Sequence, residues 1–122
     1  MREINVDVII DTIEKLCIDA NCHLPSDVKC AIKNCRACED GVIAQGILDD
    51  IIKNYEIADE ENVPICQDTG MAVVFIDIGQ DVHFVDGDFY DAVNEGVRRG
   101  YVDGKLRLSV VGDPIRRVNT ND

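Results

Sequence analysis

Residues 64–70 read Pro-Ile-Cys-Gln-Asp-Thr-Gly, and residues 71–78 continue as Met-Ala-Val-Val-Phe-Ile-Asp-Ile. The proline disfavours helical backbone at the residue before it, so a preceding helix should end upstream of this stretch. Asp68 can hydrogen-bond the backbone two residues on, and Gly70 tolerates a positive φ angle. Residues 71–78 are rich in Val, Ile and Phe, which favours a largely buried strand. The stretch therefore predicts a tight loop that enters a strand and holds polar side chains at its mouth.

Two interpretations of this loop follow from its chemistry alone. Cys66, Gln67, Asp68 and Thr69 place a thiol, an amide, a carboxylate and a hydroxyl at consecutive positions. Loops fixed to rigid elements often carry function, which favours a functional site. An ordinary Asp/Gly turn beside a buried cysteine explains the same residues equally well. The loop chemistry by itself leaves both interpretations open.

Upstream of the loop, apolar residues recur with the period of amphipathic helices. The pattern predicts one helix over residues 4–22, which Pro25 separates from a second helix with Ser26 as its N-cap. Gly41 separates the second helix from a third, whose apolar pattern is strong. The apolar rows are Val6, Ile9, Ile10, Ile13, Leu16, Cys17 and Ala20 in the first helix, Val28, Ala31, Ile32, Cys35 and Cys38 in the second, and Ile43, Ala44, Ile47, Leu48, Ile51, Ile52 and Tyr55 in the third.

Downstream of the loop, the pattern predicts a β-hairpin. Residues 79–81 are Gly-Gln-Asp, which is turn chemistry, and residues 82–85 return as a second strand beside residues 71–78. His83 alternates with apolar neighbours on that strand. Because alternate residues of a strand point to opposite faces, we expect His83 on an exposed face rather than as a catalytic base.

The last part of the chain predicts one more helix and one more strand. Gly87 and Asp88 should cap a helix that extends to Tyr101. Residues 106–111 alternate apolar and polar side chains, so they are expected to form a strand with Arg107 and Ser109 on one face.

The order of these elements indicates the fold class. Helices come first, and strands mixed with a helix follow, which is typical of an α+β fold. We expect the N-terminal helices, within residues 4–58, to pack on one side of a small, mainly antiparallel sheet. A chain of 122 residues with 46% hydrophobic and 30% charged residues is the size of one globular domain. Residues 1–122 are therefore expected to form a single domain.

The charge distribution limits the classes of partner that this protein is expected to bind. The formal net charge is −12, which argues against nucleic-acid binding through a general basic surface. Residues 1–97 hold 6 Lys/Arg and 21 Asp/Glu, whereas residues 98–122 hold 6 Lys/Arg and 3 Asp/Glu. The basic end is expected to face an anion or to meet partner structure. No apolar run is long enough to span a bilayer, and the N-terminus does not resemble a secretory signal, so we expect a cytoplasmic protein without membrane contact.

The sequence contains six cysteines, of which two form a C-x-x-C pattern at Cys35 and Cys38. That pattern is typical of zinc or redox sites, but it has no second C-x-x-C, no βαβ context and only His23 nearby. A helical row also places these positions together, which favours cysteines in a core or an interface over a metal site. Without a signal for export, we expect no disulfides among Cys17, Cys22, Cys30, Cys35 and Cys38.

The run PICQDTGMAVVFIDIG resembles the iron–sulfur-dependent class I fumarate hydratases and the related L-tartrate dehydratases. Further segments match in the same order, namely NCHLPSDV, GILDDIIKNYEIA, EGVRRGY and KLRLSVVGDPIRRVNT. The resemblance thus covers almost the whole chain and implies the N-terminal part of an α subunit. It implies reversible hydration of fumarate to (S)-malate, a reaction of the tricarboxylic acid cycle.

The resemblance also implies roles for four residues. The family holds a [4Fe–4S] cluster through three cysteines, and its free iron acts as a Lewis acid; Cys66 matches one of those cysteines. Gln67 matches a residue that hydrogen-bonds a substrate carboxylate. Asp68 matches a residue that exchanges a proton with the substrate hydroxyl or orients it, and the motif does not decide between these roles. Arg107 matches an arginine that binds a carboxylate, for which the planar guanidinium is suited.

The chain departs from the family pattern at its end. The other two cluster cysteines, the catalytic base and further substrate contacts lie later in the family sequence or in its β part. We therefore expect a truncated α subunit, inactive alone, whose partners are the rest of the α subunit, a β subunit or β domain, and a second copy in a dimeric assembly.

Two alternatives to fumarate hydration stay open. An L-tartrate dehydratase, or a relative acting on mesaconate or another hydroxy acid, shares the same motifs. A protein of another class, a non-enzymatic cysteine-rich zinc-binding or interaction module, is supported by the number of cysteines alone.

Overall fold

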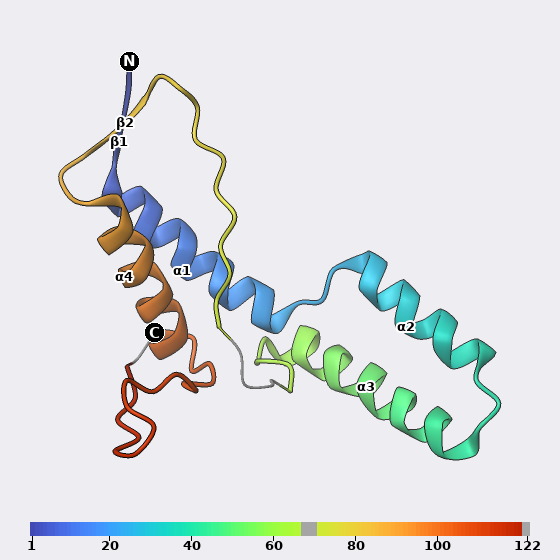
Figure 1. Cartoon of the computed structure of the whole chain (residues 1–122). Coiled ribbons are helices and arrows are strands. Elements are labelled where there is room, and N and C mark those ends of the chain that lie inside the picture. The colour runs from blue at the N-terminus through green and yellow to red at the C-terminus, as the bar shows by residue number, and fades with distance from the viewer. Residues whose placement is uncertain (67–70, 121–122) are drawn as a thin grey trace. The chain divides into compact units, whose positions relative to one another are not determined.

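The computed structural model describes residues 1–66 and 71–120, and these contain four helices and two short strands (Figure 1). The elements follow the order β1 (Arg2–Asn5), α1 (Val6–Cys22), α2 (Ser26–Cys38), α3 (Val42–Glu61), β2 (Val82–Val85) and α4 (Phe89–Asp103). The chain divides into two compact units, one made of residues 1–18 and 68–122 and the other of residues 19–67. The predicted α+β class is confirmed.

The sheet is parallel, so the expected antiparallel sheet is wrong. β1 pairs with β2 in the register Arg2↔Val82 to Asn5↔Val85. The helical period had placed residues 4 and 5 in the first helix, but Asn5 ends the strand and caps α1 by accepting a hydrogen bond from the Asp7 amide at 2.8 Å. Parallel strands require a long crossover, which here is most of the chain between β1 and β2. Because β1 and β2 are so far apart in the chain, the local sequence gives no signal that they pair.

Residues 71–78 do not form the predicted buried strand, and the hairpin with residues 82–85 is absent from the described structure. The segment has no strand assignment and is exposed, with Phe75 92% and Met71 80% accessible. Residues 106–111 likewise form only an isolated antiparallel bridge, between Val111 and Asn119. β-propensity reflects packing against neighbouring strands, and the described residues pair no strand with residues 71–78 and only this bridge with residues 106–111.

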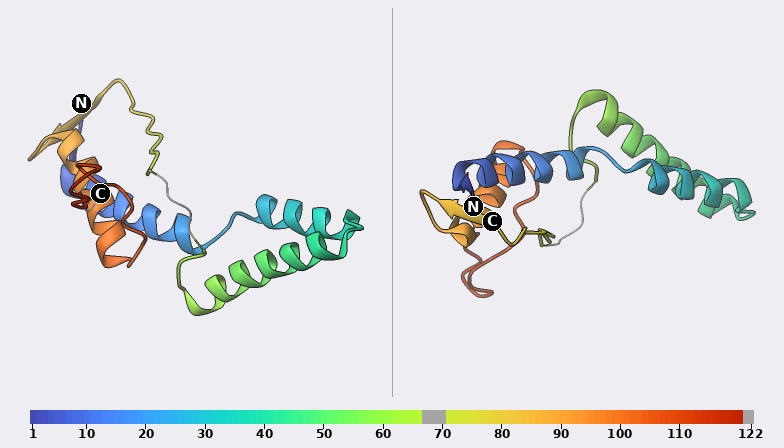
Figure 2. Two further views of the ribbon diagram at one scale, coloured as in Figure 1. Left: turned by 60° about the horizontal axis from the view of Figure 1, so that its bottom comes forward. Right: turned by 90° about the horizontal axis from the view of Figure 1, so that it is seen from above.

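Helices α1 and α4 lie side by side, and the core of the first unit forms between them and β2 (Figure 2). Val6 and Ile10 of α1 pack with Ala92 of α4, and Phe84 of β2 lies against this cluster. Asp88 is the N-cap of α4, as predicted, because its side chain accepts hydrogen bonds from the first-turn amides. The α1–α4 pair therefore fixes the position of the residues on α4.

Close approach of α1 and α4 depends on two glycines of α4. A Cβ atom on Gly96 would lie 2.8 Å from the Cβ of Ile13 and 2.9 Å from the carbonyl oxygen of Ile10. A Cβ atom on Gly100 would lie 2.7 Å from the Cβ of Cys17. Real Cβ contacts are longer than these, so both positions require glycine at the present helix separation.

The second unit is a helical hairpin of α2 and α3 with its flanking residues. Pro25, rather than the expected Ser26, occupies the N-cap position of α2, and Ser26 is the first helical residue. Tyr55 and Ala58 of α3 are buried, whereas no residue of α2 is. Helix α3 ends at Glu61, and Asn62 is its C-cap. Asn62 takes a left-handed conformation with φ of 52°, and its amide donates a hydrogen bond to the carbonyl of Ala58. None of the helices in the described ranges has both the length and the apolar character needed to cross a bilayer.

Candidate functional site

Cys66 is positioned by two backbone hydrogen bonds to helix residues of its own unit. The amide of Ile65 donates to the carbonyl of Asn21 at 2.8 Å, and the amide of Cys66 donates to Oδ1 of Asn54 at 2.9 Å. Asn21 lies near the end of α1, and Asn54 lies on α3. The Cys66 side chain is exposed, not buried as an ordinary structural cysteine would be. Its backbone is therefore held while its sulfur remains accessible to a ligand.

The two residues that follow Cys66 in the motif, Gln67 and Asp68, lie outside the described residues. Among residues 1–66 and 71–120, no three or more His, Cys, Asp or Glu side chains gather closely enough to hold a metal ion. Within the described chain, Cys66 offers one accessible thiol of the kind that iron–sulfur ligation uses.

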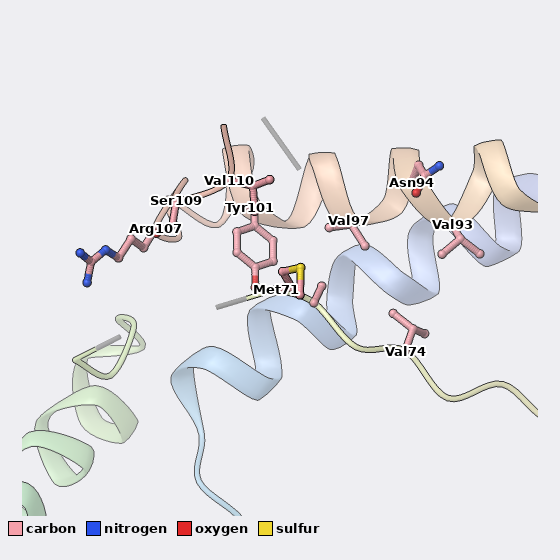
Figure 3. Close-up of a pocket in the computed structure, with 10 residues that line it drawn as sticks. Met71, Val74, Val93, Asn94, Val97, Tyr101, Arg107, Ser109 and Val110 are labelled. Carbon is pink, nitrogen blue, oxygen red and sulfur yellow. The ribbon is translucent and has the colours of Figure 1, made fainter. Parts of the chain in front are cut away.

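Arg107 borders a cavity of about 380 Å³ in the first unit. Its walls are formed by α4 on one side, by the start of the 71–78 segment on another, and by the residues around Arg107 (Figure 3). Small-molecule sites typically occupy roughly 300–1,000 Å³, so this volume suits a small ligand. The lining residues are Met71, Ala72, Val74, Val93, Asn94, Val97, Tyr101, Arg107, Ser109 and Val110.

The polar groups of this cavity come from two elements. Asn94 and Tyr101 are supplied by α4, and Arg107 and Ser109 by the extended segment that follows it. Arg107 and Ser109 are two positions apart and both line the cavity, so they lie on the same side of that segment, as predicted. In Figure 3 the guanidinium of Arg107 points away from the Tyr101 ring, at one end of the cavity. Met71, which lies beside the Tyr101 ring in Figure 3, directly follows the Cys-Gln-Asp-Thr-Gly run in sequence.

Sequence reasoning did not assign Asn94 or Tyr101 to a site. Val93, Val97 and Tyr101 belong to the apolar stripe of α4, and Asn94 lies beside it. The available signal was a polar amide beside that apolar stripe. Cys66 and Arg107 belong to different compact units, and each is placed here within its own unit.

Two other arginines near the cavity are engaged in ion pairs. Glu95 accepts hydrogen bonds from Arg98 at 2.6 Å and from Arg99 at 2.7 Å. Hydrogen bonds from Arg98 and then Arg99 lower the pKa of Glu95 from 4.5 to about 2. Arg98 and Arg99 are thus paired with a carboxylate of their own helix, and Arg107 is the arginine among the residues that line the cavity.

The histidines occupy other places. His83 lies exposed on β2, as expected. His23 contacts Asp59 of α3 through Nδ1 at 2.9 Å, and Lys29 of α2 pairs with the same carboxylate. The hydrogen bonds from Lys29 and then His23 lower the pKa of Asp59. This cluster joins the start of α2 to the last part of α3.

The cysteines outside the motif do not form a core. Cys22 is buried and Cys17 is half-buried, and in both cases desolvation raises the thiol pKa. Cys30, Cys35 and Cys38 of α2 are exposed. The expectation of core cysteines on α2 is therefore wrong; the alternative, an interface, remains a prediction.

Comparison with known proteins identifies the family. A sequence profile of the family described as fumarate hydratase (fumerase) matches residues 10–122. A protein of Methanocaldococcus jannaschii, named as a candidate L(+)-tartrate dehydratase subunit alpha, is 36% identical over 112 residues, which cover 91% of this chain and 39% of the relative. A protein of Geobacillus stearothermophilus, named as a candidate class I fumarate hydratase, is 28% identical over 118 residues, which cover 96% of this chain and 22% of the relative. This chain belongs to the fumarate hydratase family.

Proposed function

We propose that this chain acts as the N-terminal part of the α subunit of an iron–sulfur hydro-lyase that interconverts fumarate and (S)-malate. The observation that carries the proposal is the cavity bordered by Arg107, which is also lined by Met71, the residue directly after the Cys-Gln-Asp-Thr-Gly run. The cavity has a suitable volume and a cationic group at its border, and one of its lining residues directly follows the motif in sequence. The family membership supports the reaction class.

The proposed roles follow from the needs of the reaction. Arg107 binds a substrate carboxylate through a charge-assisted, bidentate hydrogen bond. Gln67 donates its amide to a carboxylate, and Asp68 exchanges a proton with the substrate hydroxyl or holds it in orientation. A single substrate with carboxylates at both ends requires such groups on more than one side.

Cys66 fits one ligand position of a [4Fe–4S] cluster, because its sulfur is accessible and its backbone is held by Asn54. When bound, such a cluster supplies a Lewis acid that assists departure of hydroxide. Oδ1 of Asn54 accepts the hydrogen bond from the Cys66 amide and so holds the backbone of the residue whose thiolate would be needed.

The activity of a complete protein requires more than this chain. The chain spans about two fifths of the length of the first relative and about one fifth of the second. We propose that the remaining cluster ligands and the catalytic base come from a further part of the α subunit and from a β subunit or β domain, in a dimeric, cytoplasmic assembly.

L-tartrate dehydration is the second candidate activity. It is favoured by the 36% identity to a relative named as a candidate tartrate dehydratase subunit alpha. Tartrate carries one hydroxyl more than malate and the same two carboxylates, so Arg107 would serve both. Steady-state kinetics with malate, fumarate and tartrate on the complete assembly separate the two activities through their kcat/KM ratio.

The proposal is tested with three variants of the complete assembly. Cys66→Ala should abolish cluster absorbance and iron content together with activity, because two remaining thiolates do not hold a cluster stably. Arg107→Ala should retain the cluster and lower kcat/KM about a hundredfold, equivalent to roughly 2–3 kcal/mol of lost transition-state binding. Asp68→Asn should retain the cluster and lower kcat, since it keeps the shape but removes proton exchange.

Arg116→Ala is the matched control, because Arg116 is exposed and does not line the cavity. It should retain both the cluster and kcat/KM. A Cys66→Ala assembly with a full cluster and normal hydration activity would refute the proposal.

A further inference from the structure

The helical hairpin of α2 and α3 has one side that is crossed by ion pairs. Lys33 contacts Glu56 at 3.3 Å, and Nε of Arg36 donates to Oδ1 of Asp49 at 2.7 Å. Each pair joins α2 to α3, so these four residues mark the charged side of the hairpin.

The opposite side of the hairpin is apolar. On α2, an apolar row at helical spacing is formed by Val28, Ala31 and Cys35. Successive residues of a helix are rotated by about 100° around its axis. The row therefore points at least a quarter-turn away from Lys33. On α3, the row of Ile43, Ile47 and Ile51 has the same relation to Glu56. Because the ion pairs fix which sides of the two helices coincide, both rows lie on the side away from them. We call these six residues the hairpin face.

The hairpin face is exposed throughout. The accessible fraction is 39% for Val28, 83% for Ile43, 57% for Ile47 and 43% for Ile51, and the remaining two residues are also exposed. A helix with a continuous apolar row normally buries it against another element. A contiguous exposed apolar surface of this kind marks an interaction site.

Charge indicates the partner. Residues 19–67 contain 4 Lys/Arg and 10 Asp/Glu, and three of the four basic side chains already pair with Asp59, Glu56 and Asp49. Asp27 and Asp50 lie at the outer edges of the two apolar rows, and neither forms an ion pair within residues 1–66 and 71–120. A second copy of the chain would bring these acidic edges together, and its net charge of −12 would repel the first.

We propose that the hairpin face binds a cationic amphipathic helix of another polypeptide. The apolar row of that helix covers the isoleucines of α3 and the Val28 row of α2, and its Lys or Arg side chains face Asp27 and Asp50. Binding of an amphipathic helix in an apolar groove is a common mode of peptide recognition. The proposed binding is independent of whether the chain is part of a hydro-lyase.

The test uses a fluorescent amphipathic Leu/Lys peptide of about 18 residues, long enough to be helical when bound. Fluorescence anisotropy should show saturable binding that weakens with salt. A scrambled peptide of the same composition, and a Leu/Glu peptide with the same apolar row, should each bind at least about tenfold more weakly, a difference of about 1.4 kcal/mol.

Adjacent positions on α3 supply a matched pair of variants. Ile43 and Val42 are both 83% accessible, but only Ile43 lies on the hairpin face. Ile43→Ala combined with Ile47→Ala should weaken binding at least about tenfold, a loss of about 1.4 kcal/mol, whereas Val42→Ala should leave binding unchanged. Asp50→Asn, which keeps the apolar row, should weaken binding and reduce its dependence on salt.

Three results would overturn the proposal: equal binding of the scrambled peptide, equal weakening by Val42→Ala, or no binding of the amphipathic peptide. Sedimentation of the chain alone provides a fourth. A dimer that dissociates in the Ile43→Ala/Ile47→Ala variant would show that the face binds a second copy instead. Circular dichroism verifies that each variant remains helical, and Asp50→Asn tests the charge argument independently if the double variant unfolds.

Discussion

Substitution of Gly96 by alanine tests whether α4 packs directly on α1. The new Cβ would lie 2.8 Å from the Cβ of Ile13 and 2.9 Å from the carbonyl oxygen of Ile10. One of these neighbours is backbone of α1, so the contact cannot be relieved by rotating a side chain. The two helices must separate, which loosens the packing of Val6 and Ala92 in the core.

The magnitude follows from two opposing effects. Overpacking of a close contact costs about 1–3 kcal/mol, whereas alanine is favoured over glycine within a helix by about 1 kcal/mol. Gly96→Ala should therefore lower the free energy of unfolding by on the order of 1 kcal/mol. Gly46 is the control, because it also lies within a helix but no heavy atom comes within 4 Å of a Cβ built there. Gly46→Ala should raise the free energy of unfolding by up to about 1 kcal/mol.

Urea unfolding followed by far-ultraviolet circular dichroism measures both variants, and the two free energies should differ by about 2 kcal/mol. Hydrogen exchange localises the effect, since Gly96→Ala should speed exchange in α1 and α4 and leave α3 unchanged. Equal stabilisation by Gly96→Ala and Gly46→Ala would refute the close packing of α1 and α4.

Three further predictions concern single groups. Asp88→Ala removes the two hydrogen bonds at the start of α4 and should cost about 1 kcal/mol in urea unfolding; an unchanged midpoint would contradict the cap. Folding lowers the pKa of Glu95 from 4.5 to about 2. The ionised Glu95 carboxylate therefore stabilises the fold fully at pH values above 4.5, and this stabilisation is lost as the pH falls towards 2. In the Glu95→Gln variant the free energy of unfolding should therefore decrease less as the pH falls from 4.5 to 2. The same decrease as in the unsubstituted protein would exclude this ion pair. Rapid alkylation should modify the four exposed cysteines about tenfold faster than Cys17 and Cys22, whose pKa values are raised by burial, and mass spectrometry would expose any native disulfide.

Helices were the elements most accessible from sequence. The third helix was expected after Gly41 and begins at Val42, and Asp88 caps α4 as predicted. Both signals are local, because capping and the 3.6-residue period involve neighbours within one or two turns. The motif with Cys66 and Arg107 was likewise readable, since it is carried by residue identity and order.

Strands were the elements least accessible. Residues 71–78 have strong β-propensity but stay unpaired in the described structure, whereas the mostly polar segment Arg2–Asn5 pairs with β2. Strand pairing depends on the partner that the fold supplies, and here that partner lies eighty residues away in the register Arg2↔Val82.

The sequence by itself indicated the helices of the described chain and where α3 and α4 begin, which family motifs are present, and that the chain carries strong negative charge. Those properties arise from local backbone preferences and from residue identity. Only the tertiary structure decided that β1 and β2 are parallel, that Asn94, Tyr101 and Ser109 share a cavity with Arg107, and that the apolar row of α2 is exposed. These depend on which distant segments meet, and a periodic pattern defines an apolar face without specifying what covers it.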